Sequence, residues 1–238
     1  MANPAVVQRV AELAQHYTPS DETLAFARSL DIVTVSGPTG VGKDTVMEAT
    51  GLPMVSGWTS REPSERDGAK FQYIASEQQW EWLEEELRSG RFVQATMHPT
   101  TGNFYGSTTT DYHAGTVNLI DVVPQQVDDF RMSNLFGSVR SAYITVAGYA
   151  ALHERLAKRS PMNSDDRAKR LREAASSLSF ALQDENNNFY FILNESRDEA
   201  TRRLREFATE DKRHPWVDTA GRRAGRVILD GVRAQLQL

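Results

Sequence analysis

The sequence contains no cysteine among its 238 residues. Without a thiol, the chain can form neither a disulfide nor a thiolate metal site, and it has no cysteine nucleophile. It also lacks any apolar run long enough to cross a membrane, so we expect no membrane partner. The sequence does not open with a basic segment followed by an apolar one, as a secretory signal would, and we therefore expect a cytoplasmic protein.

Positive charge is the scarcer sign, with 27 lysines and arginines against 32 acidic residues and a net charge of −5. This balance argues against general binding of nucleic acid. The five histidines are isolated, and none is paired with an acidic residue at the spacing of metal ligands. With 39% hydrophobic and 25% charged residues, the composition is that of a globular chain. Its length fits one α/β domain with inserted subdomains, or two small domains.

A glycine-rich segment at residues 36–45 is the strongest motif. It follows the β-branched run 32–35 and precedes apolar residues at helical spacing. A strand, a glycine-rich turn and a helix in that order provide the context of a phosphate-binding loop. Gly37, Gly40 and Gly42 allow the backbone to curve around an anion, and Lys43 supplies a positive charge for phosphate oxygens. A turn that binds nothing is the alternative, but the flanks, the spacing and the lysine all favour a phosphate site.

The residue after the lysine is unusual. A serine or threonine normally stands there and holds Mg²⁺ through its hydroxyl, whereas this chain has Asp44 followed by Thr45. A carboxylate can bind Mg²⁺ directly or through a metal-bound water, so Asp44 is a candidate metal ligand. It could equally be a carboxylate that stabilises the helix N-terminus. Thr45 is the better candidate for a hydroxyl contact to an α-phosphate.

Predicted strands and helices alternate along the rest of the chain. This alternation predicts a parallel sheet flanked by helices, with the ligand site at the carboxyl ends of the strands. We expect two helices in the first 30 residues, packed on the surface or, alternatively, binding a partner. The expected strands are 32–35, 54–58, 71–74, 92–97, 116–123, 141–146 and 189–193, and the expected helices are 4–17, 21–30, 43–51, 76–88, 124–132, 148–159, 167–182 and 196–209.

Several short motifs occur in order between about residues 31 and 211. They are the loop Gly-Pro-Thr-Gly-Val-Gly-Lys at 37–43, Thr-Ser-Arg-Glu-Pro at 59–63, Gly-Asn-Phe-Tyr-Gly-Ser at 102–107, Leu-Ile-Asp-Val at 119–122, the segment 151–171, and Ile-Leu-Asn at 192–194. Together, in this order and spacing, they resemble guanylate kinases. The resemblance implies a P-loop NTPase-type α/β fold. It places an acceptor-binding subdomain at about 53–115 and a lid at about 153–170 within the domain 31–211, and leaves residues 1–30 and 212–238 as extensions.

The resemblance also implies roles for individual residues. It implies catalytic roles for Lys43, Arg155, Arg159 and Arg170; ATP binding by Gly37, Gly40, Gly42, Lys43, Asp44, Thr45 and Asn194; acceptor binding by Arg61, Arg66, Tyr105, Ser107 and Asp121; and an Mg²⁺ contact at Asp44. Arg66 is a displaced substitute, because the family's second acceptor-phosphate arginine falls near Ser64.

The implied activity is the Mg²⁺-dependent transfer of the γ-phosphoryl group of ATP to a phosphate monoester, a nucleoside monophosphate in this family. The acceptor half departs from the pattern. The family's first acceptor tyrosine falls at Phe71 and its guanine-reading glutamate at Met97, which is followed by an insertion at 98–101. A thioether cannot accept the donors of guanine, so we expect weaker selectivity for guanine.

Two other functions stay open. The tripeptide Lys43-Asp44-Thr45 also resembles ribose 1,5-bisphosphate kinases, which share the fold and use a sugar phosphate as acceptor. A non-catalytic guanylate-kinase-like binding module is the second alternative, although such modules tend to lose the phosphate loop. The sequence does not indicate an oligomeric state.

Overall fold

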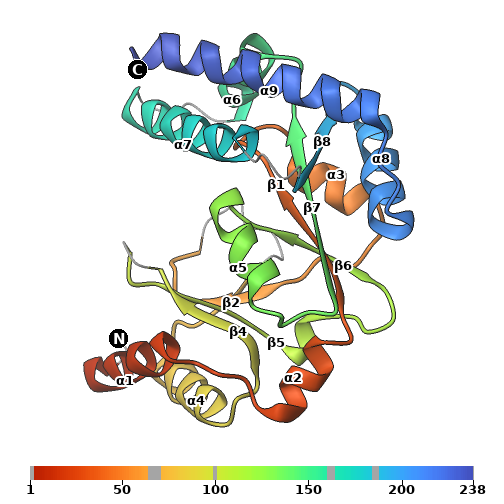
Figure 1. Ribbon diagram of the computed structural model, residues 1–238. Coiled ribbons are helices and arrows are strands. Elements are labelled where there is room, and N and C mark those ends of the chain that lie inside the picture. Colours follow the sequence, from red (N-terminus) through yellow and green to blue (C-terminus); the bar gives the residue numbers. More distant parts are fainter. Residues whose placement is uncertain (1–2, 64–70, 99–100, 160–163, 184–187, 238) are drawn as a thin grey trace. The chain divides into compact units, whose positions relative to one another are not determined.

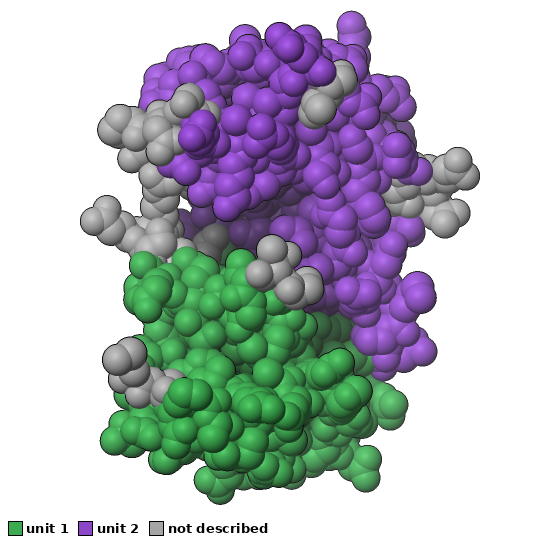
Figure 2. All heavy atoms as spheres, turned by 90° about the vertical axis from the view of Figure 1, so that its left-hand side faces the viewer, with its two compact units in different colours: residues 1–30, 53–118, 135–137 green, residues 31–52, 119–134, 138–238 purple. Residues whose placement is uncertain are grey.

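A computed structural model describes residues 3–63, 71–98, 101–159, 164–183 and 188–237 (Figure 1). The chain divides into two compact units, which Figure 2 shows in different colours. One unit contains residues 1–30, 53–118 and 135–137, and the other contains residues 31–52, 119–134 and 138–238. Each unit has a four-stranded sheet.

The sheet of residues 31–52 and 119–238 is parallel and has the strand order β6-β1-β7-β8. Its strands are continuous apolar runs, as expected where helices flank a sheet, and Ile32, Ile144 and Phe191 are fully buried. The predicted α/β fold is therefore confirmed. The strands are β1 Asp31–Ser36, β6 Val117–Asp121, β7 Ser138–Thr145 and β8 Phe189–Leu193, and the helices are α3 Lys43–Ala49, η2 Pro124–Gln126, α5 Val127–Met132, α6 Tyr149–Arg159, α7 Ser164–Leu182, α8 Arg197–Glu210 and α9 Pro215–Leu236.

The sheet of residues 53–118 is mixed and has the strand order β3-β2-β5-β4. β2 pairs in parallel with β3, while β5 pairs antiparallel with both β2 and β4. One face of this sheet shares a hydrophobic core with α1 and α4, in which Val10, Leu83 and Phe104 are fully buried. The strands are β2 Gly57–Thr59, β3 Phe71–Tyr73, β4 Phe92–Met97 and β5 Phe104–Thr108, and the helices are α1 Pro4–Gln15, α2 Asp21–Ala27, α4 Glu77–Arg88 and η1 Thr109–Asp111.

The N-terminal helix predicted at residues 4–17 is α1, and an ion pair fastens it to α4. Arg9 donates two hydrogen bonds to the carboxylate of Glu84, at 2.9 and 2.8 Å, and Arg88 donates to the same carboxylate. These hydrogen bonds from Arg9 and Arg88 lower the pKa of Glu84 to about 2. The apolar side of α1 packs on the sheet of its own unit.

Two predictions of secondary structure were wrong. The strand expected at 54–58 is the shorter β2, and β5 was not predicted as a strand at all. β5 contains Gly106, whose flexibility is typical of turns. In the sheet, a Cβ at Gly106 would lie 2.7 Å from the rings of Phe92 and Phe104. Close packing against these rings therefore requires a glycine within the strand, and this tertiary contact overrides the local preference.

The last segment of the chain forms one long helix, α9, which lies beside α7 and β8 (Figure 1). Two of its side chains form hydrogen bonds with the backbone of β8, the edge strand of the sheet. Asp218 accepts a hydrogen bond from the backbone N–H of Phe191 at 2.9 Å, and Arg222 donates to the backbone oxygen of Phe189 at 2.8 Å. The two side chains also pair with each other. The helix therefore satisfies groups on the edge strand that would otherwise be open to another strand.

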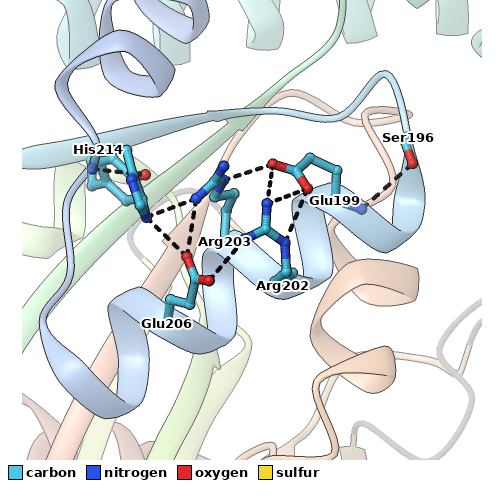
Figure 3. Close-up of polar contacts among 7 residues, drawn as sticks. Ser196, Glu199, Arg202, Arg203, Glu206 and His214 are labelled. Atoms are coloured by element: carbon cyan, nitrogen blue, oxygen red, sulfur yellow. Dashed lines mark hydrogen bonds and ion pairs between the residues drawn. The ribbon is translucent and has the colours of Figure 1, made fainter.

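A polar cluster joins α8 to the beginning of α9 (Figure 3). Arg203 lies between Glu199 and Glu206, 2.7 and 3.1 Å from their carboxylates. The imidazole Nε2 of His214 is 2.9 Å from Glu206, and the guanidinium of Arg203 lies 4.9 Å from the ring centre of Trp216. Burial raises the pKa of Glu206, but the hydrogen bond with His214 and the nearby arginine charges outweigh it, so the pKa is below its ordinary value. The cluster fixes the start of α9 on α8.

In the part of the chain that the structure describes, no helix is both long enough and apolar enough to span a bilayer.

Candidate functional site

The glycine-rich segment forms the connection between β1 and α3. Gly42 is the N-cap of α3 with a left-handed conformation, at φ 88°. Gly37 has φ 145°, and a Cβ there would overlap the backbone oxygen of Ile144. Only glycine meets both requirements at these positions. The loop therefore has the backbone curvature and the packing that a phosphate-binding loop needs.

Lys43 turns back across this loop. Its ammonium donates to the backbone oxygen of Gly37 at 2.8 Å and lies 3.7 Å from a carboxylate oxygen of Asp121, the last residue of β6. The sequence associated Asp121 with the acceptor, and the structure brings it to the lysine of the loop. Asp44 is half-buried in the first turn of α3, and Thr45 beside it is exposed.

Two predicted site residues hold the loop from outside, through the backbone oxygen of Val41. Asn194, directly after β8, donates to this oxygen at 2.7 Å, and Arg155 of α6 donates to it at 2.9 Å. The second terminal nitrogen of Arg155 donates to the backbone oxygen of Asn194 at 2.8 Å. Arg155 and Asn194 thus form a clamp, here named the Val41 clamp, that connects α6 and β8 to the loop.

Apolar contacts strengthen the connection between α6 and the loop. A Cβ at Gly40 would lie 2.9 Å from a methyl group of Leu156, and Leu152 lies beside it. Both leucines are buried. The sequence alone does not assign Leu152 and Leu156 to the site, because their helical spacing indicates only that they lie on the core-facing side of α6.

The remaining predicted arginines of this unit are Arg170 in α7 and Arg159 at the end of α6. The guanidinium of Arg170 is 3.4 Å from the hydroxyl of Thr39 in the loop and 3.6 Å from Glu173. Arg159 is the last residue of α6, and its side chain is outside the part that the structure describes. A hollow of about 330 Å³ adjoins the Val41 clamp, lined by Ala147, Ala151, Glu154, Arg155, Lys158, Asn194 and Glu195.

The predicted acceptor-binding residues of the other unit lie on or beside its mixed sheet. Arg61 follows β2, its guanidinium 5.3 Å from the ring centre of Phe71, and it donates to the backbone oxygen of Glu62. The rings of Phe71 and Tyr105 meet edge to face at 6.2 Å. A hollow of about 390 Å³ beside Arg61 is lined by Ser60, Arg61, Glu62, Pro63, Tyr73, Ile74, Ala75 and Trp80. Arg66 lies outside the described residues.

Ser107 and Met97 lie on different faces of that sheet. The hydroxyl of Ser107 is 2.8 Å from the hydroxyl of buried Tyr112. Met97 packs against the hydrophobic core shared with α1 and α4. Its pairing partner is Phe104, which lies on the core face, whereas Tyr105 and Ser107 point the other way. Met97, which the sequence matched to the position of the family's guanine-reading glutamate, therefore faces the core and not the side of Tyr105 and Ser107.

Comparisons with known proteins agree with the architecture. No family model matches the sequence, and no curated protein matches it. Among solved structures, 62 chains are similar to this one. One is a guanylate kinase from Anaplasma phagocytophilum, with 20% sequence identity and a TM-score of 0.50, covering 80% of this chain and 90% of that chain. This likeness shows that the chain has a guanylate-kinase-like P-loop fold.

Proposed function

We propose that this protein is a guanylate-kinase-like phosphotransferase that moves the γ-phosphoryl group of ATP to a phosphate monoester, a nucleoside monophosphate. One observation carries the proposal: a glycine loop of the required curvature, with Lys43 held across it between the backbone of Gly37 and Asp121. This arrangement occurs in a fold that is similar to a guanylate kinase.

In the proposed reaction the protein positions donor and acceptor and neutralises charge on the migrating phosphoryl group. A phosphate monoester is already a nucleophile, so the transfer needs no general base. Lys43 would exchange the Gly37 oxygen for phosphate oxygens of the donor. Arg170, near Thr39, and Arg159, at the end of α6, would neutralise the charge of the migrating group. Arg61 and Tyr105, with Arg66, would hold the acceptor phosphate, because the arginine fork matches phosphate oxygens.

The residues around the loop fit a magnesium ion. No group of three metal-ligating side chains occurs within the described residues. Mg²⁺ does not require one, because it is usually held by one or two carboxylates together with waters and substrate phosphates. Asp44 and Asp121, both near Lys43 in the fold, would supply these carboxylates. When bound, the ion would offset negative charge on the donor phosphates.

The hollow beside the Val41 clamp suits the base of the donor nucleotide. It adjoins Asn194 and Arg155 and is about 330 Å³ in volume, at the small end of ligand pockets. The polar groups of Asn194, Glu154 and Lys158 at its wall would orient a purine, and Thr45 would reach the α-phosphate.

Isothermal titration calorimetry with ATP and Mg²⁺ separates an enzyme from a non-catalytic binding module. We expect ATP to bind, and the Lys43→Ala variant to bind it more weakly while it stays folded, as its circular dichroism spectrum would show. Lys212→Ala, which removes a charge at an exposed position after α8 and outside the hollow beside the Val41 clamp, is the matched control. A coupled assay of ADP release across nucleoside monophosphates and ribose phosphates then identifies the acceptor. Absence of ATP binding at millimolar concentration would refute the kinase function, and turnover with ribose phosphates alone would favour the ribose 1,5-bisphosphate kinase alternative.

A further inference from the structure

The helix α6 contacts both the phosphate loop and the C-terminal helix α9, which lies beside it in Figure 1. The middle of α6 holds the loop. Arg155 donates to the backbone oxygen of Val41. Leu152 and Leu156 lie against Gly40. Because an α-helix is a stiff element, a displacement of α6 at α9 would move all of these groups relative to the loop.

The contact between α6 and α9 depends on a glycine. Tyr149 is the first residue of α6, and a Cβ at Gly231 of α9 would lie only 2.5 Å from its Cβ and 2.6 Å from its Cγ. These atoms form the base of the side chain, so no rotation of the ring can make room. Just before α6, a Cβ at Gly148 would lie 3.2 Å from a methyl group of Val227 of α9. A side chain at position 231 would therefore push α6 and α9 apart.

Tyr149 contributes its ring to this contact, and its hydroxyl forms no hydrogen bond there. The side chain is half-buried, and its ring centre lies 5.8 Å from that of His153. Within the described residues, the buried hydroxyl of Tyr149 has no hydrogen-bond partner. A buried hydroxyl without a partner costs desolvation and returns no hydrogen bond. Packing of the ring is therefore what joins Tyr149 to α9.

Another glycine of α9 has different neighbours. A Cβ at Gly225 would lie 3.4 Å from Leu178 and 3.6 Å from both Leu182 and Phe191, which are ordinary van der Waals distances. These residues belong to α7 and β8, and none belongs to α6. An alanine thus fits at position 225 but not at position 231. The two positions separate the contact with α6 from the general effect of a glycine in α9.

We infer that Gly231 and Tyr149 are positioning residues for the ATP site. Their contact sets the position of α6, and α6 in turn holds Val41 of the phosphate loop through Arg155. Neither Gly231 nor Tyr149 touches the substrate. The inference rests on the proposed function for its link to ATP, whereas the coupling of α9 to the loop can be tested without a ligand. The extension 212–238 thereby supports the loop as part of the same unit.

Hydrogen exchange followed by mass spectrometry tests this coupling in the ligand-free protein. In Gly231→Ala we expect the backbone amides of residues 36–46 to exchange about fivefold faster or more, because the loop loses the support of α6. The amides of β7 should exchange as in the wild type, which shows that the sheet stays folded. Gly225→Ala is the matched control and should leave the exchange of the loop within about twofold of the wild type.

Two variants of Tyr149 keep the test informative if Gly231→Ala does not fold. Tyr149→Phe retains the ring and loses only the unpartnered hydroxyl, so the exchange of the loop should stay within about twofold of the wild type. Tyr149→Ala removes the ring and should speed the exchange of the loop. A wild-type rate in Tyr149→Ala, or a response of the loop in Gly225→Ala as large as that in Gly231→Ala, would overturn the inference.

Calorimetry with ATP tests the link from α9 to the site. Gly231→Ala should bind ATP about fivefold more weakly or worse. In a chain that already carries Arg155→Ala, the same change should alter the affinity by no more than about twofold, because the connection through which it acts is gone. An equal loss of affinity with and without Arg155 would contradict a role that passes through this arginine.

Exchange and binding also separate this inference from the proposed function. If the loop responds in Gly231→Ala but the wild-type protein binds no ATP, the coupling of α9 to the loop holds and the proposed function fails. If the wild-type protein binds and uses ATP while Gly231→Ala changes neither the exchange of the loop nor the ATP affinity, the proposed function holds and the positioning role is wrong.

Discussion

Replacement of Arg155 by alanine distinguishes a structural role in the Val41 clamp from a direct role on substrate. Arg155 donates to the backbone oxygens of Val41 and Asn194, at 2.9 and 2.8 Å. A hydrogen bond from a charged group contributes about 1.5–3 kcal/mol. Val41 keeps its bond from the Asn194 amide in the variant, so the two losses do not add fully. We expect the free energy of unfolding to fall by about 2–3 kcal/mol, which corresponds to a melting temperature about 5–10 °C lower.

Thermal unfolding followed by circular dichroism measures this loss, and calorimetry measures ATP affinity on the same samples. Arg226→Ala is the matched control, because Arg226 is an exposed arginine of α9 and does not line the hollow beside the Val41 clamp. That change should cost less than about 0.5 kcal/mol. Arg155→Lys keeps the charge but loses the two-pronged contact, so it should resemble alanine more than the wild type. If Arg155→Ala melted like the wild type and lost only turnover, Arg155 would act on the substrate and not on the loop.

Three further predictions concern the loop, α1 and α9. Gly37→Ala should abolish ATP binding measured by calorimetry, because the new Cβ would overlap the backbone oxygen of Ile144; unchanged affinity would show that the loop adapts freely. Glu84→Gln should lower the melting temperature at pH 7 by weakening the pairing with Arg9, an effect of order 1 kcal/mol. Since the pKa of Glu84 is lowered from 4.5 to about 2, this difference should be full above pH 4.5 and vanish as the pH falls toward 2; a constant difference would refute the ion pair. Arg222→Met should destabilise the protein by about 1–3 kcal/mol in thermal unfolding, since the backbone oxygen of Phe189 loses its donor, and wild-type stability would contradict the edge contact.

The phosphate loop was predictable because its signals are local. A β-branched strand, three glycines and Lys43 lie within twelve consecutive residues, and the chain folds them next to one another. The buried strands were predictable for the same reason, since a continuous apolar run such as 189–193 indicates a strand with helices on both sides.

The mixed sheet of residues 53–118 was harder to predict because its pairing is not local. Which side chains of β4 lie on the side of Tyr105 and Ser107 depends on one bulge in β4 and on the length of the hairpin to β5. The local residue pattern shows neither the bulge nor the hairpin length. A shift of one residue in the strand register nevertheless moves every side chain of the strand to the other face. The sequence likewise predicted a helix at the N-terminus, but it could not show that Arg9 pairs with Glu84, 75 residues later.

Phosphorus NMR of the reaction products is the most direct test of the proposed phosphotransferase. The protein, ATP, Mg²⁺ and a nucleoside monophosphate should yield ADP and a nucleoside diphosphate in equal amounts. Lys43→Ala should reduce the rate by about 100-fold or more, because the lysine stabilises charge in the transition state, while the variant stays folded. If the wild-type protein binds ATP but phosphorylates no nucleoside monophosphate or sugar phosphate, or if Lys43→Ala is as active as the wild type, the proposed function is wrong.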